Sequence, residues 1–315
     1  MASSSRPALP RKSVLALFGP TASGKTAVAA ILRERLGAEV ISADSAALYV
    51  GLPVLTAAPG YPAALVEVVP LDRDVSVGEY QRLAHAAIDA AERPLVVGGT
   101  GLYLRAALSA LELPPAPAAD RRAFWRVEVE RLGPEAAHRL LEARDPAAAR
   151  RVHPNDTKRL VRALELREAG FSLAPPTDRL WSEDTRLPTT IVALDLPLDV
   201  LDRRIEQRTR AMADAGAAEE ARRAWASPLS ATARKVLGLE EFATLPEPEA
   251  IEAVTAATRK LARYQRKWLR KMPGVVRLDG NRPAEEVADA VDALGREWKR
   301  LPGGDRRGHA GAGAH

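Results

Sequence analysis

The sequence predicts an α/β protein in which a parallel sheet flanked by helices carries an all-helical insertion domain. Short apolar segments alternate with helical patterns over the first hundred residues, and a glycine-rich turn follows the first of them. Between two proline-rich segments the pattern is purely helical. Because alternating strands and helices form parallel sheets, we expect a discontinuous core domain, residues 1–115 and 189–301. The insertion is expected at 116–188, and a Gly/Ala-rich disordered tail at 302–315.

The first part of the core contains four predicted strands. In order, they are Val14–Phe18, Glu39–Ala43, Leu65–Val69 and Leu95–Val97. A helix is expected to follow the glycine-rich turn and to run to about Leu36. A second helix is expected to begin after Ser76 and to run to about Ala91, because Ser76 and Glu79 have the spacing of a capping box.

The helical insertion lies between prolines. Leu113–Pro117 contains three prolines, and residues 120–170 are rich in Arg, Ala and Leu with a helical pattern throughout. Pro175 and Pro176 close this block, and the β-branched segment Thr189–Leu196 returns to the sheet. The remaining predicted elements are helices at about 199–226, 248–271 and 284–298 and a last strand at Val275–Leu278.

The composition excludes several classes of site. Cysteine is absent, which excludes a disulfide scaffold, a thiol nucleophile and a Cys-ligated zinc or iron–sulfur site. The five histidines are scattered and contain no His-x-x-x-His pair, which argues against a His-rich metal site. No apolar run approaches the roughly 20 residues that a transmembrane helix needs, so we expect a soluble cytoplasmic protein. The net charge of +5 has two explanations, a solvated basic surface or a polyanionic partner.

The glycine-rich turn is a candidate phosphate site. Residues 19–26, Gly-Pro-Thr-Ala-Ser-Gly-Lys-Thr, fit the pattern G-x-x-x-x-G-K-[ST] between a strand and a helix. In such a loop the backbone N–H groups and the helix N-terminus converge on an anion, Lys25 adds a positive charge, and the Thr26 hydroxyl can ligate Mg²⁺. The core is therefore predicted to be P-loop NTPase-like and to bind a di- or triphosphate. Kinases, NTPases and transferases with a diphosphate leaving group all need this arrangement.

Two polar positions follow predicted strands. Asp44 comes directly after the second strand, and Thr100 follows Gly98 and Gly99 at the end of the fourth. The carboxyl ends of strands face the ligand crevice in a doubly wound sheet, so Asp44 is a candidate general base or Mg²⁺ partner. The alternative for Asp44 is an N-cap of the next turn, and for Thr100 an ordinary strand-to-helix turn.

Two runs of the sequence are strongly basic. Residues 258–271 carry seven cations and no acid. At helical spacing its arginines share one face, predicted to bind phosphates, while an apolar face is predicted to pack against the core. The arginines are Arg259, Arg263, Arg266 and Arg270, and the apolar residues Leu261, Tyr264 and Trp268. The second run is 153–162, in which Asn155 or Asp156 is predicted to cap a helix that carries Lys158 and Arg162 at i and i+4. A solvated basic face is the alternative for each run.

Taken together, these residues resemble the tRNA dimethylallyltransferases, also called tRNA isopentenyltransferases. The similar stretches follow the family's order and spacing: 19–26, 42–45, 97–103, 153–156, 162–165 and 258–265. The P-loop is generic, whereas His-Pro-Asn-Asp at 153–156 and Thr-Arg-Lys-Leu-Ala-Arg-Tyr-Gln at 258–265 are specific to this family. The resemblance implies transfer of a dimethylallyl group from its diphosphate to the exocyclic amine of the adenosine 3′ of the anticodon in tRNA.

The resemblance also implies roles for individual residues. Asp44 is expected to engage the amine as a base, and the catalytic set is Asp44, Lys25 and Thr100, with Mg²⁺ near Thr26. The diphosphate is expected on Gly19, Thr21, Ala22, Ser23, Gly24, Lys25 and Thr26. The tRNA-binding positions are Asp44, Ser45, Ala46, Ala47, Thr100, Arg122, Lys158, Arg159, Arg162, Lys235, Arg259, Arg263 and Gln265. The expected partners are the tRNA anticodon stem-loop and dimethylallyl diphosphate, with no membrane, and the protein is expected to be a monomer.

The chain departs from the family pattern at several positions, and two other functions stay open. The departures are Ala47, Ala58, Ala63, Ala64, Lys158, Lys235, Leu239 and Tyr264, the last in place of an arginine. A P-loop small-molecule or nucleoside kinase would explain 19–26 and Asp44 but would not need the basic run at 258–271. A binding protein that kept the fold and lost catalysis would explain the departures.

Overall fold

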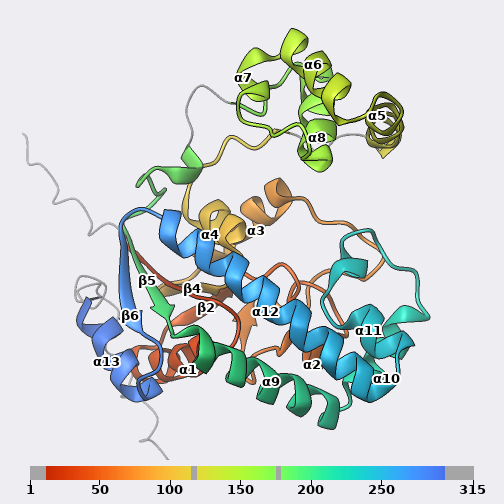
Figure 1. Ribbon diagram of the computed structural model, residues 1–315. Helices are drawn as coiled ribbons and strands as arrows, with labels where there is room; N and C mark the ends of the chain where they lie inside the picture. Colours follow the sequence, from red (N-terminus) through yellow and green to blue (C-terminus); the bar gives the residue numbers. More distant parts are fainter. Residues whose placement is uncertain (1–11, 115–118, 175–178, 295–315) are drawn as a thin grey trace, which may run out of the picture. The chain divides into compact units, whose positions relative to one another are not determined.

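The computed structural model describes residues 12–114, 119–174 and 179–294 and divides the chain into two units (Figure 1). Unit 1 consists of Met1–Ala110 and Glu183–His315, and unit 2 of Leu111–Ser182. The insertion predicted at 116–188 thus differs from unit 2 at both ends. At its C-terminal end the reason is local, because the Ser109 Oγ donates to the Asp184 carbonyl (2.8 Å) and the Arg186 N–H donates to the Leu108 carbonyl (2.7 Å).

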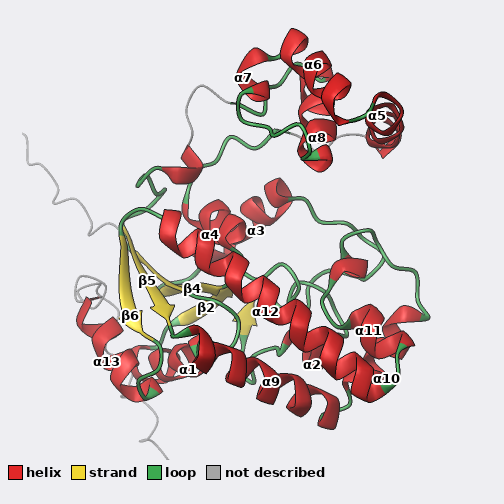
Figure 2. Ribbon diagram, in the orientation of Figure 1, coloured by secondary structure: helices red, strands yellow, loops and turns green. Residues whose placement is uncertain are grey.

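Unit 1 is built on a six-stranded parallel sheet (Figure 2). Its strands are β1 (Val14–Phe18), β2 (Glu39–Ser42), β3 (Ala63–Ala64), β4 (Pro94–Gly98), β5 (Thr189–Asp195) and β6 (Val275–Asp279), in the order β3-β2-β4-β1-β5-β6. Strand β1 is buried along its whole length, and its last residue, Phe18, pairs with Gly98 of β4 and Ala193 of β5. The loop after β1 therefore leaves the middle of the sheet at its carboxyl edge.

Helices cover both faces of the sheet in unit 1. They are α1 (Lys25–Leu36), α2 (Pro53–Thr56), α3 (Val77–Ala90), α4 (Gly101–Leu108), α9 (Leu198–Asp214), α10 (Ala217–Trp225), α11 (Leu239–Thr244), α12 (Glu247–Lys271) and α13 (Ala284–Leu294), with a 3₁₀ turn η2 at Ala233–Lys235. Helices α1 and α13 pack on one face, where Leu15, Leu17, Val28, Leu32 and Val287 form one apolar cluster. Helices α3 and α4 contact β2 and β4.

Unit 2 is helical. Its elements are α5 (Ala119–Leu132), α6 (Pro134–Arg144), α7 (Pro146–Ala149), α8 (Thr157–Glu168) and a 3₁₀ turn η1 (Arg179–Trp181). Its core is formed by Trp125, Leu141 and Leu160 with their neighbours. Of the two predicted caps of α8, Asp156 is the one the structure uses, because its side chain accepts a hydrogen bond from the Arg159 N–H (3.1 Å).

The third strand was predicted wrongly. The structure places β3 at Ala63–Ala64, before the predicted segment, because Leu65 (φ 63°) and Glu67 (φ 52°) have left-handed backbone conformations that no strand can contain. Val69, at the end of the predicted strand, forms only an isolated bridge to Tyr49. The apolar residues of this stretch are therefore part of an irregular loop.

The predicted helix over 199–226 is two helices. Gly216 (φ 92°) separates α9 from α10, since a left-handed glycine ends one helix and allows the chain to begin another. Helix α13 is described as far as Leu294, and the predicted continuation to 298 and the predicted tail lie outside the described residues. Within the part of the chain that is described, no helix is long and apolar enough to span a membrane.

Candidate functional site

The loop between β1 and α1 has the geometry of an anion cradle. Gly24 caps the N-terminus of α1 in a left-handed conformation (φ 92°), and Ala22 is also left-handed (φ 62°). Glycine has no side chain to satisfy the N–H groups of the first helical turn, so these groups can be offered to a ligand. The loop that the sequence predicts to bind phosphate, Gly19 to Thr26, therefore presents backbone donors where the helix dipole favours negative charge.

Lys25 lies over this loop and is half-buried. Its Nζ donates to the Pro20 carbonyl (2.6 Å) and to the Ser23 Oγ (3.4 Å). Burial and the Arg208 guanidinium together lower the pKa of Lys25 to about 7, against the smaller opposing effect of Asp44. A polyanion bound in the loop would favour the charged ammonium form, so ligand binding and protonation of Lys25 are coupled.

This coupling predicts that the Lys25 amine takes up a proton when the protein binds inorganic diphosphate at pH 8. Above its pKa of about 7 the free amine is mostly neutral, and the bound polyanion restores its charge. Calorimetry without Mg²⁺, in buffers of different ionisation enthalpy, measures the protons exchanged on binding. We expect the wild type to take up about one proton more than Lys25→Met, which has no amine to protonate. Equal proton counts in the two proteins would contradict this coupling.

Arg208 is a residue of this site that sequence reasoning missed. It comes from α9, and its Nη1 donates to the Thr21 Oγ1 (3.0 Å). Burial lowers the pKa of Arg208, and the attraction of Asp44 opposes that effect. Arg208 therefore adds a second cation beside Lys25, with Asp44 as the nearby carboxylate. A sequence signal did exist, because Arg208 stands where the apolar stripe of α9, with Leu201 and Ile205, would place an apolar residue.

Asp44 lies at the carboxyl end of β2, where it borders two adjoining cavities. The phosphate cavity is bordered by Thr21, Lys25, Thr26, Val40, Ser42, Asp44, Ala47, Thr56, Ala57, Ala58, Pro59, Tyr61, Ala63, Val66, Val97, Gly98, Gly99, Arg208 and Gln265. The second cavity is bordered by Thr21, Asp44, Ser45, Ala46, Leu55, Thr56, Thr100, Ile205, Arg208, Thr209, Met212, Lys235, Val236, Leu237, Phe242, Val254, Thr258, Leu261 and Gln265. Asp44 is common to both, so it stands where they meet.

The Asp44 carboxylate is partly engaged by its own turn. Its Oδ1 accepts a hydrogen bond from the Ala46 N–H (3.0 Å), in keeping with the capping alternative, while the side chain still borders both cavities. Thr100 is the N-cap residue of α4 but makes no capping hydrogen bond, and it borders the second cavity. The structure therefore brings three predicted catalytic residues, Lys25, Asp44 and Thr100, around one pair of cavities.

The two glycines at the carboxyl end of β4, Gly98 within it and Gly99 after it, allow the close approach of three segments. A Cβ atom on Gly98 would lie 2.2 Å from the Ala43 carbonyl oxygen, and one on Gly99 would lie 2.6 Å from the Gln265 Nε2. Gln265 of α12 also accepts a hydrogen bond from the Thr21 N–H at its Oε1 (2.8 Å). Gln265, predicted as a tRNA-binding residue, is buried against the P-loop.

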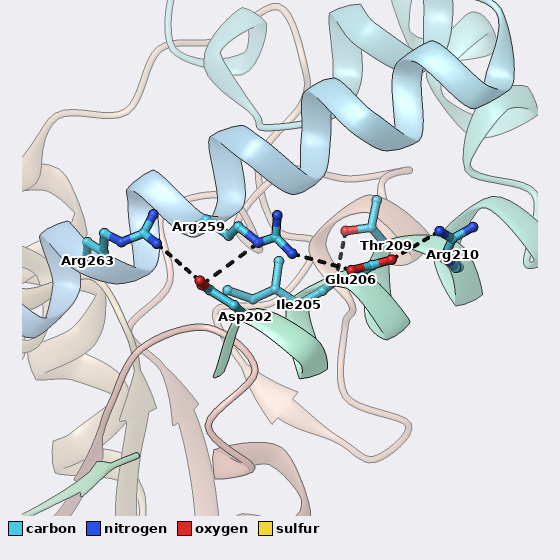
Figure 3. A network of polar contacts seen from close by, with 7 residues as sticks. All are labelled: Asp202, Ile205, Glu206, Thr209, Arg210, Arg259 and Arg263. Atoms are coloured by element: carbon cyan, nitrogen blue, oxygen red, sulfur yellow. Dashed lines mark hydrogen bonds and ion pairs between the residues drawn. The ribbon is translucent and has the colours of Figure 1, made fainter. Parts of the chain in front are cut away.

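Helices α9 and α12 are joined by a network of ion pairs (Figure 3). Asp202 lies between Arg263 (3.1 Å) and Arg259 (3.9 Å), and Arg259 also pairs with Glu206 (3.3 Å). Glu206 in turn pairs with Arg210 (3.0 Å). These contacts hold together the two helices that bring Arg208 and Gln265 to Thr21.

The predicted packed face of α12 was wrong for Leu261 and Tyr264 but right for Trp268, which is half-buried beside Gly101 of α4. Arg259 and Arg266 face neighbouring carboxylates, the latter pairing with Asp195 of β5 (2.8 Å). The apolar face predicted to pack is instead partly on the surface, since Leu261 is 38% and Tyr264 is 56% exposed. The side chains that α12 buries in this part are Ala262, Gln265 and Leu269. The packed side of this helix is therefore formed by these buried side chains and by the arginines that pair with carboxylates of the same chain.

The other predicted tRNA-binding cations occupy two places. Lys235 is exposed and borders the second cavity. The rest lie in unit 2, where Arg122 (3.2 Å) and Arg162 (3.4 Å) both pair with the buried Glu165. Two further predicted cations of α8, Lys158 and Arg159, are exposed, and Arg159 pairs with Asp156 (3.5 Å). The predicted tRNA-binding cations therefore belong to both units.

Comparison with known proteins identifies close relatives. A family model described as IPP transferase matches residues 47–272. A protein of Thermomicrobium roseum named tRNA dimethylallyltransferase is 36% identical, over 91% of this chain and 93% of the relative. A protein of the same name from Anaeromyxobacter dehalogenans is 40% identical, over 87% of this chain and 97% of the relative. The crystal structure of the full-length tRNA isopentenylpyrophosphate transferase from Bacillus halodurans is similar with a TM-score of 0.64 and 27% identity, covering 92% of this chain and 98% of that chain.

Proposed function

The chain belongs to the IPP transferase family, and we propose that it transfers a dimethylallyl group from dimethylallyl diphosphate to tRNA. The acceptor is the exocyclic amine of the adenosine 3′ of the anticodon, and the product is isopentenyladenosine. The observation that carries this proposal is the position of Asp44 between two cavities, one with a phosphate cradle and one bordered by Thr100. A donor and an acceptor that enter from different cavities would meet at this carboxylate.

The phosphate cavity has the chemistry of a prenyl diphosphate site. Thr21, Lys25 and Thr26 border it with polar and cationic groups. Its other bordering side chains include a set of small apolar ones, Val40, Ala47, Ala57, Ala58, Ala63, Val66 and Val97. A kinase would need this cavity to accept a nucleoside triphosphate, whereas an apolar surface beside the cradle suits a five-carbon hydrocarbon. This favours the transferase over the kinase.

We assign the steps of the transfer to residues of this chain. The C1–O bond of the donor breaks and its electron pair leaves with the diphosphate, whose growing charge Lys25, Arg208 and the loop N–H groups stabilise. The adenine amine nitrogen forms the new bond to C1 and becomes cationic. Asp44 accepts a hydrogen bond from this amine and then takes its proton. The target adenosine must leave its stack to reach the site, as in other enzymes that modify a base.

A Mg²⁺ ion fits the residues of the phosphate cavity when it arrives with the diphosphate. The described residues contain no group of three or more His, Cys, Asp or Glu side chains that could hold a metal alone. Mg²⁺, however, keeps several waters and needs few protein oxygens when substrate phosphates also bind it. Thr26 and Asp44 both border this cavity. We propose the Thr26 hydroxyl as the protein ligand, and the ion would offset charge on the diphosphate.

We also propose that the enzyme is a monomer and acts in the cytoplasm. The residues that border the two cavities belong to unit 1.

The direct test is to incubate the protein with dimethylallyl diphosphate, Mg²⁺ and undermodified tRNA. We expect isopentenyladenosine after digestion of the tRNA, detected by mass. A tRNA with guanosine in place of the target adenosine is the matched control, and it should give no prenylated nucleoside because it lacks the adenine amine. Parallel reactions with ATP and nucleosides test the kinase alternative. A phosphorylated nucleoside without any prenylated tRNA would overturn the proposal.

A further inference from the structure

Two apolar side chains stand on the surface of α12 where the sequence predicted a packed face. Leu261 is 38% exposed and Tyr264 is 56% exposed. Residues three apart on a helix lie on the same side, so these side chains form one exposed apolar strip.

This strip lies beside the second cavity. Thr258, Leu261 and Gln265 of α12 border that cavity, together with Asp44 and Thr100. Tyr264 follows Leu261 by three residues and precedes Gln265, and helical geometry therefore places it on the outer side of the residues that border the cavity. A molecule that enters the second cavity along α12 would pass this ring.

Cations flank the ring one helical turn away on each side. Lys260 stands four residues before Tyr264 and Lys267 three residues after it, and both are exposed. Among the described residues neither lysine has an ion-pair partner, whereas Arg259 and Arg263 are paired with carboxylates of α9. A positive charge without an ion-pair partner among the described residues therefore stands on each side of the tyrosine.

From this arrangement we propose that Tyr264 is a stacking platform for an anticodon-loop base next to the reacting adenosine. The inference rests on the proposed function. When the adenosine is extruded into the second cavity, its neighbour loses a stacking partner. An exposed aromatic side chain supplies one, for any base. Lys260 and Lys267 are placed to contact the phosphates on either side of that base. Tyr264 thus binds the loop in the opened conformation from which the adenosine reaches Asp44.

The proposal separates binding from chemistry, because Tyr264 lies outside the residues that border the phosphate cavity. We expect Tyr264→Ala to raise the KM for an anticodon stem-loop RNA about tenfold, which is typical of the loss of one base–aromatic stack. The kcat and the affinity for dimethylallyl diphosphate should stay within twofold of the wild type. Tyr264→Phe, which keeps the ring, should behave as the wild type. The control is Leu198→Ala, which removes another exposed apolar side chain of unit 1.

Measurements of RNA binding distinguish the loss of a stacking contact from a general loss of contact area on the protein surface. Fluorescence anisotropy gives the Kd of a labelled stem-loop and of RNAs with an abasic residue on either side of the adenosine. We expect one abasic site to weaken binding to the wild type about tenfold and to have no further effect on Tyr264→Ala, since both changes remove the same contact. Additive losses at both positions, or an unchanged Kd in Tyr264→Ala, would overturn the stacking role. A wild type that binds the stem-loop but makes no isopentenyladenosine would instead overturn the proposed function.

Discussion

Replacing Lys25 with alanine is expected to lower the rate of prenyl transfer by about 10²–10³-fold, the cost of removing one preorganised donor from a developing anion. The diphosphate leaves with its full charge, and Lys25 is the P-loop cation that borders its cavity. The effect is large because Lys25 is half-buried, where charges interact more strongly than in bulk water. The measurement is single-turnover prenyl transfer at saturating tRNA and donor.

The same substitution should leave the fold intact. The pKa of Lys25 is about 7 in the folded chain and 10.5 ordinarily, so between these values the unfolded chain binds more protons. The free energy of unfolding therefore rises with pH across this window, and at pH 7.5 the buried amine is a cost that Lys25→Ala removes. We expect a Tm no lower than that of the wild type. The control is Lys12→Ala, at a lysine outside both cavities. A near-normal transfer rate in Lys25→Ala would exclude the P-loop as the diphosphate site.

Replacing Asp44 with asparagine is expected to lower the single-turnover rate by about 10²–10⁴-fold, the usual contribution of general-base catalysis. The lone pair of an adenine amine is delocalised into the ring. A carboxylate that accepts one of its N–H groups favours attack and then holds the proton. Asparagine keeps the size and the oxygen that accepts from the Ala46 N–H, but it cannot take a proton. The affinity for tRNA should therefore stay within a few-fold of the wild type.

The matched control for Asp44→Asn is Asp72→Asn, because Asp72 is an exposed carboxylate of the same unit and does not border either cavity. Its rate should equal that of the wild type. Equal rates for Asp44→Asn and the wild type would remove Asp44 from the mechanism. The next base to test would then be Thr100, which borders the second cavity, or the phosphates of the substrate.

The parts of the site that lie next to regular elements could be predicted from the sequence. Strand β1 has the predicted bounds Val14–Phe18, and α1 ends at the predicted Leu36. The P-loop between them could also be predicted, because its motif and the strand and helix beside it are contiguous in the sequence. Asp44 could be placed near that loop for a related reason, since all strands of a parallel sheet end at one edge.

Contacts between distant helices could not be predicted in this way. The sequence of α9 does not indicate that Asp202 and Glu206 pair with arginines of α12. The periodicity of α12 alone therefore predicted burial for Leu261 and Tyr264, which are exposed. The same holds for Gln265, whose contact with Thr21 joins residues 244 positions apart. The misplaced third strand has another cause, because apolar composition does not reveal a left-handed residue such as Leu65.

The positions at which unit 2 leaves and rejoins unit 1 determine how well the fold tolerates insertions and deletions in unit 2. Leu108 and Arg186 are hydrogen bonded to each other, so unit 2 begins and ends on a closed loop of the core. The entropy of closing such a loop grows only with the logarithm of its length, and each doubling costs about 0.6 kcal/mol. Insertions or deletions within residues 111–182 should therefore change the free energy of folding of the sheet very little. The helical unit can diverge in length and sequence while the strand order that places Lys25 and Asp44 stays the same.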